Sequence, residues 1–200
     1  AHARDMGVFI ISPADKGGML YRPPEKLTAL CDPLHPLIFN CLFCLAQPEI
    51  HTLSLGASCP DDFDLQLQTL AYINQADQLL PPIRTRLQEA MCEAVGTEMA
   101  AYQGDDLPAW HESPGYMNLP VMLWLRKLAL SYDMLDYARM RYNLLGNGGH
   151  WFPGLNAAQI DKHDLEEACA KSTFAETLPE LLRETHTMLY EEPSKRLSQS

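Results

Sequence analysis

The sequence predicts a mainly α-helical fold that contains two short parallel β-strands. Two short runs rich in β-branched and other apolar residues, at residues 7–11 and 50–55, have the length and composition of strands. A polar segment and then a helical pattern follow each run, whereas after about residue 78 the chain reads as helices and turns alone. Strands that alternate with helices form parallel sheets, so we expect these two strands to be parallel neighbours.

The first βα unit starts at the strand 7–11. A loop follows, in which glycine allows close approach of the backbone to a ligand; it contains Ser12, Pro13, Lys16, Gly17, Gly18 and Leu20. Two prolines then precede a helix predicted at residues 25–31, which Asp32 and Pro33 end. A second, apolar helix is predicted at residues 35–47, before Pro48.

The second βα unit starts at the strand 50–55, which opens into Gly56, Ala57 and Ser58. Ser58 stands three residues before Asp61, which is the spacing of a capping box at the start of a helix. One face of that helix carries Phe63, Leu67, Leu70 and Ile73. Two such units resemble the last part of a parallel (β/α)8 TIM barrel, in which the loops after the strands hold the ligand.

The rest of the chain is predicted to be a second, helical domain, so that the domains are residues 1–77 and 78–200. An apolar stripe from Ile83 to Met99 predicts a helix that begins near Asp77 and stops at Gly104. Asn118 is placed to cap a long helix that continues through Tyr142. The last helices are expected at residues 157–171 and 178–191.

Charge and cysteine content limit the classes of function. The 200 residues carry a formal net charge of -11, which argues against nucleic-acid binding. The six cysteines fall mostly in apolar or helical contexts, which indicates reduced thiols and a cytoplasmic location. The apolar run at residues 37–46 is too short to cross a membrane. The sequence has no initiator methionine, so we expect a fragment of a longer protein.

Several of these segments together resemble the C-terminal part of the aldo/keto reductase family. The matching residues are 7–13 with 17–20, then 42–48, then 56–66. In that family they correspond to strand seven with its Ser-Pro loop, helix seven, strand eight, and the cofactor loop with its helix. The resemblance implies a TIM-barrel enzyme that reduces a small carbonyl substrate with NADPH.

The helical remainder resembles the C-terminal extension of a ferredoxin-linked branch of that family. The matching segments are 114–115 with 119–120, then 136–142 and 178–182. In relatives, cysteine runs in this extension hold iron–sulfur clusters, which need about four thiolates each. Here other residues stand at the positions of those runs, so no cluster is expected; they are Ala109, Glu112, Ser113, Lys162, Leu165, Ala168 and Ser172.

The resemblance implies half of a cofactor site. The catalytic tyrosine, lysine, aspartate and histidine of the family lie on earlier strands, so this fragment alone should be inactive. The pyrophosphate of the cofactor would meet Ser12, Pro13 and the backbone from Lys16 to Leu20, and its adenosine end would meet Gly56, Ala57, Ser58, Asp62 and Gln66. Many relatives have a cation at the Ser58 position for the 2′-phosphate, whereas here Asp61, Asp62 and Asp64 follow. NADP, NAD and no cofactor therefore stay open.

The same residues also predict the partners of this chain and an alternative function. The expected partner is the missing N-terminal part of the barrel, and exposed apolar surface would favour homo-oligomers. The alternative is a non-catalytic helical module for protein interaction. Cys41 and Cys44 form a C-x2-C pair that we interpret as buried structural cysteines, since no second pair follows. His111, His150 and His163 lack the spacing of metal ligands.

Overall fold

The computed structural model describes residues 1–14, 19–57, 59–145, 151–192 and 194–195. It is mainly helical and contains two short parallel strands near the N-terminus, as the sequence predicts. Two compact units make up the chain, Ala1–Ala90 (unit 1) and Met91–Ser200 (unit 2). The described residues form no barrel, so the larger (β/α)8 architecture stays a prediction.

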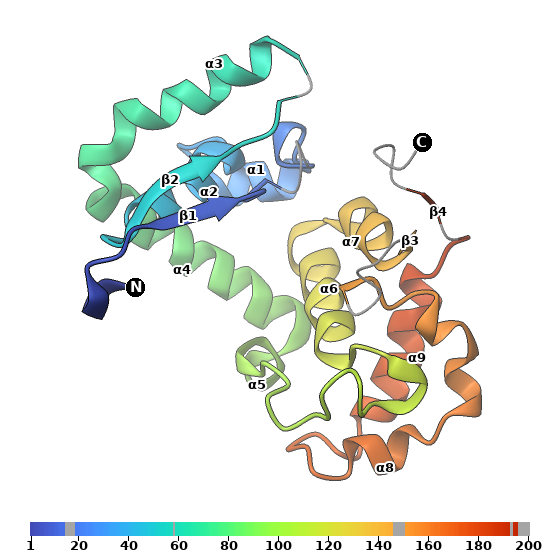
Figure 1. Ribbon diagram of the computed structural model, residues 1–200. Helices are drawn as coiled ribbons and strands as arrows, with labels where there is room; N and C mark the ends of the chain where they lie inside the picture. The colour runs from blue at the N-terminus through green and yellow to red at the C-terminus, as the bar shows by residue number, and fades with distance from the viewer. Residues whose placement is uncertain (15–18, 58, 146–150, 193, 196–200) are drawn as a thin grey trace. The chain divides into compact units, whose positions relative to one another are not determined.

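The two predicted strands of unit 1 pair in parallel (Figure 1). β1 (Val8–Ile11) and β2 (Ile50–Ser54) align so that Ile11 lies opposite Ser54. Backbone hydrogen bonds extend the ladder at both ends, from the Val8 N–H to the Glu49 carbonyl (2.8 Å) and from the Ser12 N–H to the Ser54 carbonyl (3.2 Å). The carboxyl ends of both strands therefore lie at the same edge of the sheet.

Helices α1 (Glu25–Cys31) and α2 (Pro36–Leu45) confirm the two helices predicted between the strands. His35 begins α2, because its Nδ1 accepts a hydrogen bond from the Leu37 N–H at 3.2 Å. Leu37 and Cys41 are buried on α2 and pack against Leu53 of β2. One face of the sheet is thus covered by α2.

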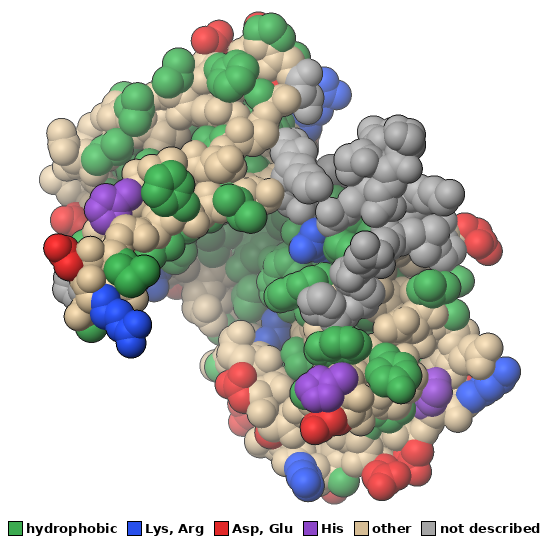
Figure 2. Space-filling view, viewed as in Figure 1, with side chains coloured by type: hydrophobic (Ala, Val, Ile, Leu, Met, Phe, Trp, Pro, Cys, Tyr) green, Lys and Arg blue, Asp and Glu red, His purple; other side chains and the backbone are tan. Residues whose placement is uncertain are grey.

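The opposite face of the sheet is open in unit 1. Phe9 and Ile11 are 71% and 76% exposed, because the alternation along β1 turns them away from α2. Apolar residues on both faces are typical of strands that are covered on both sides in a parallel sheet. Figure 2 shows hydrophobic side chains exposed over this part of unit 1.

Helix α3 (Asp61–Gln68) and the 3-10 helix η3 (Thr69–Gln75) follow β2. The predicted apolar face is exposed rather than packed, with Phe63, Leu67, Leu70 and Ile73 between 42% and 61% exposed. Leu65 and Thr69 lie inward instead. The predicted capping residue, Ser58, lies outside the described residues; the Asp62 carboxylate accepts a hydrogen bond from the Cys59 N–H at 3.2 Å.

Helix α4 (Ala76–Val95) contains the boundary between the two units. It begins beside Asp77 as predicted, and Pro81 and Pro82 lie inside it. The Arg86 side chain donates hydrogen bonds to the Leu30 carbonyl (2.9 Å) and to the Asp32 carbonyl at the end of α1. The helix ends at Gly96, whose φ of +84° suits glycine, and not at Gly104 as the apolar stripe predicts.

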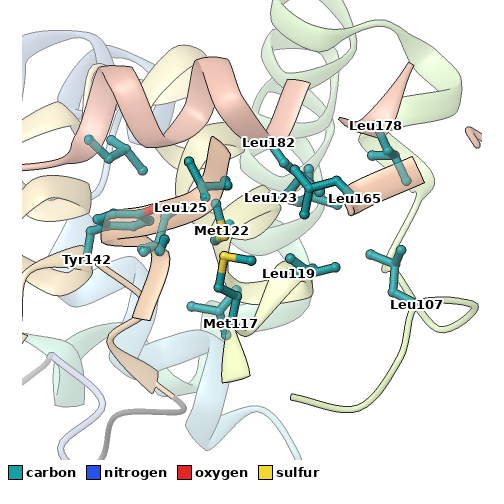
Figure 3. Close-up of a cluster of buried hydrophobic side chains, with 14 of the residues drawn as sticks. Leu107, Met117, Leu119, Met122, Leu123, Leu125, Tyr142, Leu165, Leu178 and Leu182 are labelled. Atoms are coloured by element: carbon teal, nitrogen blue, oxygen red, sulfur yellow. The ribbon is translucent and has the colours of Figure 1, made fainter. Parts of the chain in front are cut away.

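Helix α6 (Leu119–Tyr132) is the centre of unit 2. Asn118 caps it as predicted, because its Oδ1 accepts a hydrogen bond from the Val121 N–H at 3.2 Å. Figure 3 shows Met122 and Leu125 of α6 and Leu182 of α9 (Leu178–Leu189) as members of one cluster of buried side chains. Most faces of α6 are buried, so it is a core helix rather than an amphipathic surface helix.

The long helix predicted through Tyr142 is two helices. Asp133 takes a left-handed conformation (φ +56°) and ends α6, and α7 (Leu135–Tyr142) begins after it. The helix predicted at residues 157–171 is also divided, since Asp164 starts a new helix by accepting a hydrogen bond from the Glu167 N–H at 2.8 Å. The remaining elements are η1 (His2–Arg4), η2 (Met19–Tyr21), α5 (Thr97–Ala101), η4 (Pro114–Tyr116), β3 (Leu144–Leu145), η6 (Asn156–Lys162), α8 (Leu165–Cys169) and β4 (Ser194–Lys195).

Asn143 after α7 should be a major source of stability in unit 2. Its buried amide donates to the carbonyls of Arg139 and Leu189 (both 2.8 Å) and accepts from the Glu191 N–H (3.1 Å). Asn143→Ala should lower the free energy of unfolding by about 2–4 kcal/mol, because buried backbone groups lose their partners. Urea denaturation followed by tryptophan fluorescence measures this, since all three tryptophans lie in unit 2. Exposed Gln103→Ala, the control, should change it by less than ~0.5 kcal/mol.

The stability of unit 2 should also fall in mild acid because of His186. The Tyr142 hydroxyl lies 2.9 Å from His186 Nδ1, and burial lowers the pKa of His186, although the Asp161 carboxylate opposes that shift. As the pH falls below about 6.5, the unfolded chain binds a proton at His186 before the folded chain does. The free energy of unfolding should therefore decrease as the pH falls through this range, and the decrease should be smaller in His186→Gln. His111 is exposed, so His111→Gln is the control. If it reduced the pH dependence as much as His186→Gln does, the assignment to His186 would be wrong.

Candidate functional site

The candidate site lies at the carboxyl ends of β1 and β2, where parallel pairing brings together two loops that are distant in sequence. Ser12 and Pro13 leave β1, and Gly56 and Ala57 follow β2. Ser12 has a left-handed conformation (φ +53°), and its N–H still pairs with Ser54. Ser12, Gly56 and Ala57 are exposed, so this edge is accessible in unit 1.

A hydrogen-bonded group holds the loop after β2. The Tyr21 hydroxyl donates to the Gly56 carbonyl, and the Gln66 side-chain amide donates to the same carbonyl at 3.1 Å and to the Tyr21 oxygen. These three residues come from η2, the loop after β2 and α3. The network fixes Gly56 relative to both neighbouring helices, so Gln66 supports the loop in this structure.

Packing positions the loop after β1. The Asn40 amide of α2 donates a hydrogen bond to the Pro13 carbonyl at 3.2 Å. Ala14 is buried against Leu37 and Cys41, and Leu20 lies half-buried at the edge of the same cluster. Leu20 thus contributes apolar packing, and Asn40 fixes the position of the Pro13 backbone.

The structure brings together seven of the eleven predicted cofactor residues at or beside one end of the sheet. They are Ser12, Pro13, Leu20, Gly56, Ala57, Asp62 and Gln66. The other four predicted residues, Lys16, Gly17, Gly18 and Ser58, lie outside the described residues. The predicted anion contact of Lys16 and the glycine backbone is therefore a prediction still.

The charge of the described part of the site is negative. Asp61, Asp62 and Asp64 occupy the first turn of α3, where carboxylates interact favourably with the helix dipole. The Asp62 carboxylate binds the Cys59 N–H, so it serves the start of α3. A second phosphate on a bound nucleotide would meet like charge here, whereas ribose hydroxyls would meet acceptors.

The C-x2-C pair, Cys41 and Cys44, lies within packed protein rather than at an exposed surface. Cys41 is 1% exposed and Cys44 is half-buried on α2. Burial raises the pKa of the Cys41 thiol to about 11, and the neighbouring Cys44 adds to this shift. Such thiols stay protonated and are poor nucleophiles and poor metal ligands at neutral pH. Among the described residues no group of three or more His, Cys, Asp or Glu side chains is arranged to hold a metal ion.

Leu165 and Ser172, two of the residues at positions where the resemblance implies cluster cysteines, contribute to the packing of unit 2. Leu165 is fully buried in the hydrophobic core. The Ser172 hydroxyl lies 2.7 Å from the Tyr102 hydroxyl and accepts a hydrogen bond from the Phe174 N–H at 3.1 Å. Leu165 therefore contributes apolar packing to unit 2, and Ser172 contributes hydrogen bonds to it.

Sequence reasoning missed two residues that shape the site. Asn40 is the one amide within the apolar run at residues 37–46, and a lone polar residue in such a run indicates a buried hydrogen-bond partner. Tyr21 directly follows the predicted loop residue Leu20, but nothing in its spacing indicates that its hydroxyl reaches Gly56. That contact depends on the return of the chain through β2.

Within the described residues, no single helix is long and apolar enough to cross a bilayer, although α1 and α2 meet that test together as a pair bent by 48°.

No model of a known protein family matches the chain, and no curated protein or solved structure matches it.

Tyr21 should control the order of the loop after β2. Tyr21→Phe removes the hydroxyl that binds the Gly56 carbonyl and Gln66, so the loop should open more often. Amide hydrogen exchange in a peptide covering residues 55–66 should become faster by about fivefold, which corresponds to the loss of about 1 kcal/mol. Tyr72→Phe on η3 is the control and should leave this exchange unchanged. Equal acceleration in both variants would show that the hydroxyl of Tyr21 does not hold the loop.

Proposed function

We propose that this chain is the C-terminal portion of an NAD(P)-dependent oxidoreductase similar to aldo/keto reductases, and that the carboxyl ends of β1 and β2 bind the cofactor. Ser12, through its hydroxyl, and the neighbouring Pro13 line the pyrophosphate site, and Gly56, Ala57 and Gln66 line the adenosine end. Hydride transfer to a small carbonyl substrate uses catalytic residues in the remaining, N-terminal part of the barrel. This portion alone binds and does not catalyse.

The parallel pairing of β1 and β2 carries the proposal. In parallel α/β sheets, ligands bind at the carboxyl ends of the strands, because the loops there converge and expose backbone N–H groups. Ile11 lies opposite Ser54, so the residues that leave the two strands stand at the same edge. An antiparallel or unpaired arrangement would have separated Ser12 from Gly56.

The acidic first turn of α3 favours NAD over NADP. Asp61, Asp62 and Asp64 occupy the first turn of α3, which in the proposed site faces the 2′-position of the adenosine ribose. Like charges at about 4 Å repel by about 1 kcal/mol in water and by more in a partly buried site. A free ribose hydroxyl can donate a hydrogen bond to a carboxylate, whereas a phosphate cannot.

The proposed partner of unit 1 is the rest of the barrel. Within the described residues β1 and β2 pair only with each other. Each strand therefore has one long side along which a further strand could pair. Phe9 and Ile11 expose an apolar face, which two-stranded sheets cannot cover by themselves. Further parallel strands and the barrel interior would satisfy both features.

A second candidate function, a non-catalytic interaction module, is favoured by the surface of α3 and η3. Phe63, Leu67 and Leu70 are 53%, 60% and 61% exposed and share one side of the helix by their spacing. Apolar surface of this kind marks contact sites for proteins. This function needs no dinucleotide, so cofactor binding separates the two candidates.

Calorimetric titration of the chain with NADH and NADPH tests the cofactor proposal. We expect NADH to bind at least as tightly as NADPH. Ala57→Asp adds a negative charge at the exposed exit of β2 and should weaken both dinucleotides by about tenfold or more, through repulsion of the pyrophosphate. The matched control is Ala158→Asp, at an exposed position of unit 2, and it should change neither affinity.

Failure of both dinucleotides to bind at millimolar concentration would contradict the cofactor proposal and leave the interaction module. Binding that is insensitive to Ala57→Asp would show that the dinucleotide lies elsewhere. Tighter binding of NADPH than of NADH would contradict the effect assigned to Asp61, Asp62 and Asp64.

A further inference from the structure

Unit 2 contains a cavity that is separate from the proposed cofactor site. Its volume is about 680 Å³, which lies within the range of small-molecule binding sites. Apolar side chains form most of the wall. They include Met99 of α5, Leu123 and Leu130 of α6, Phe174 before α9, and Leu181 of α9. Such a lining accommodates an alkyl or aryl group.

A buried cation forms part of the same wall. Lys127 of α6 is 6% exposed, although lysine is rarely buried without a charged partner. Its ammonium donates a hydrogen bond to the Tyr102 carbonyl, and burial lowers its pKa. No ion pair among the described residues includes Lys127, so its charge is balanced by a carbonyl dipole alone.

The other charges of the wall are Arg126 and Glu98. Arg126 is paired, since its guanidinium lies 3.0 Å from the Glu184 carboxylate. Glu98 is exposed, so water screens its carboxylate. Of the three charged side chains in this wall, Lys127 is therefore the one that is almost withdrawn from solvent and has no counter-ion among the described residues.

We propose that this cavity binds a small anionic amphiphile, in which a carboxylate pairs with Lys127 and an alkyl or aryl body packs against Met99, Leu123 and Phe174. The carboxylate supplies the missing counter-charge at a desolvated ammonium, where a charge-assisted hydrogen bond is strong. The apolar body leaves water for the apolar wall. The site uses residues of unit 2 alone and is independent of dinucleotide binding.

Calorimetric titration with three ligands of the same chain length tests this proposal: octanoate, 1-octanol and octylammonium. Octanoate should bind at least tenfold more tightly than 1-octanol, and octylammonium should bind most weakly, because it meets Lys127 with like charge. The apolar contacts are the same for all three, so the order reports on the charge of the cavity.

Two variants locate the site. Lys127→Met keeps the length of the side chain and removes its charge, so octanoate should weaken at least tenfold, to the affinity of 1-octanol, which should not change. The matched control, Lys162→Met, removes an exposed lysine and should have no effect. Leu130→Trp narrows the cavity from a partly exposed position and should weaken octanoate and 1-octanol together.

Any one of three results would overturn the proposal. They are the absence of octanoate binding at millimolar concentration, equal affinity for octanoate and 1-octanol, and unchanged octanoate binding in Leu130→Trp. If Lys127→Met does not fold, the ligand order and Leu130→Trp decide between the outcomes. If Lys127 only ties α6 to Tyr102, its replacement lowers thermal stability without changing the preference between octanoate and 1-octanol.

Discussion

The parallel ladder between β1 and β2 is the interaction on which the candidate site depends. It joins residues that are about forty positions apart in the chain, and it aligns Ile11 with Ser54 so that both strands end at one edge. The hydrogen bond from the Ser12 N–H to the Ser54 carbonyl continues the ladder into the loop. Without this pairing, Tyr21 and Gln66 would have no common acceptor at Gly56.

The ladder also explains the unusual surface of unit 1. α2 covers one face of the sheet through Leu37 and Cys41, whereas Phe9 and Ile11 face away from it. Parallel strands are rich in apolar residues on both faces because both faces are usually covered. The open face and the open edges are the physical basis for proposing that further strands of a barrel complete this unit.

Unit 2 is stabilised in a different way, by a core helix with a few buried polar groups. α6 packs on α7 and α9, and Asn143 binds the backbone at the ends of both neighbouring segments. Tyr102 connects to Ser172 and Asp106, and burial, followed by its hydrogen bond to Asp106, raises the pKa of Tyr102 to about 12. Lys127 is buried in this core, its ammonium donates to the Tyr102 carbonyl, and no ion pair among the described residues includes it, which is the physical basis for proposing an anionic ligand in the adjoining cavity.

The sequence by itself determined the two strands, the helices between them and the cap at Asn118, because apolar periodicity and capping residues act over a few positions. It predicted where α4 and α6 begin more reliably than where they end: Gly96 and Asp133 stop them through local backbone conformation that an apolar stripe does not reveal. Only the tertiary structure decided that Phe63 and Leu67 are exposed, that Tyr21 holds Gly56, and that Lys127 is buried beside a cavity. These features depend on contacts between distant segments, which no local pattern encodes.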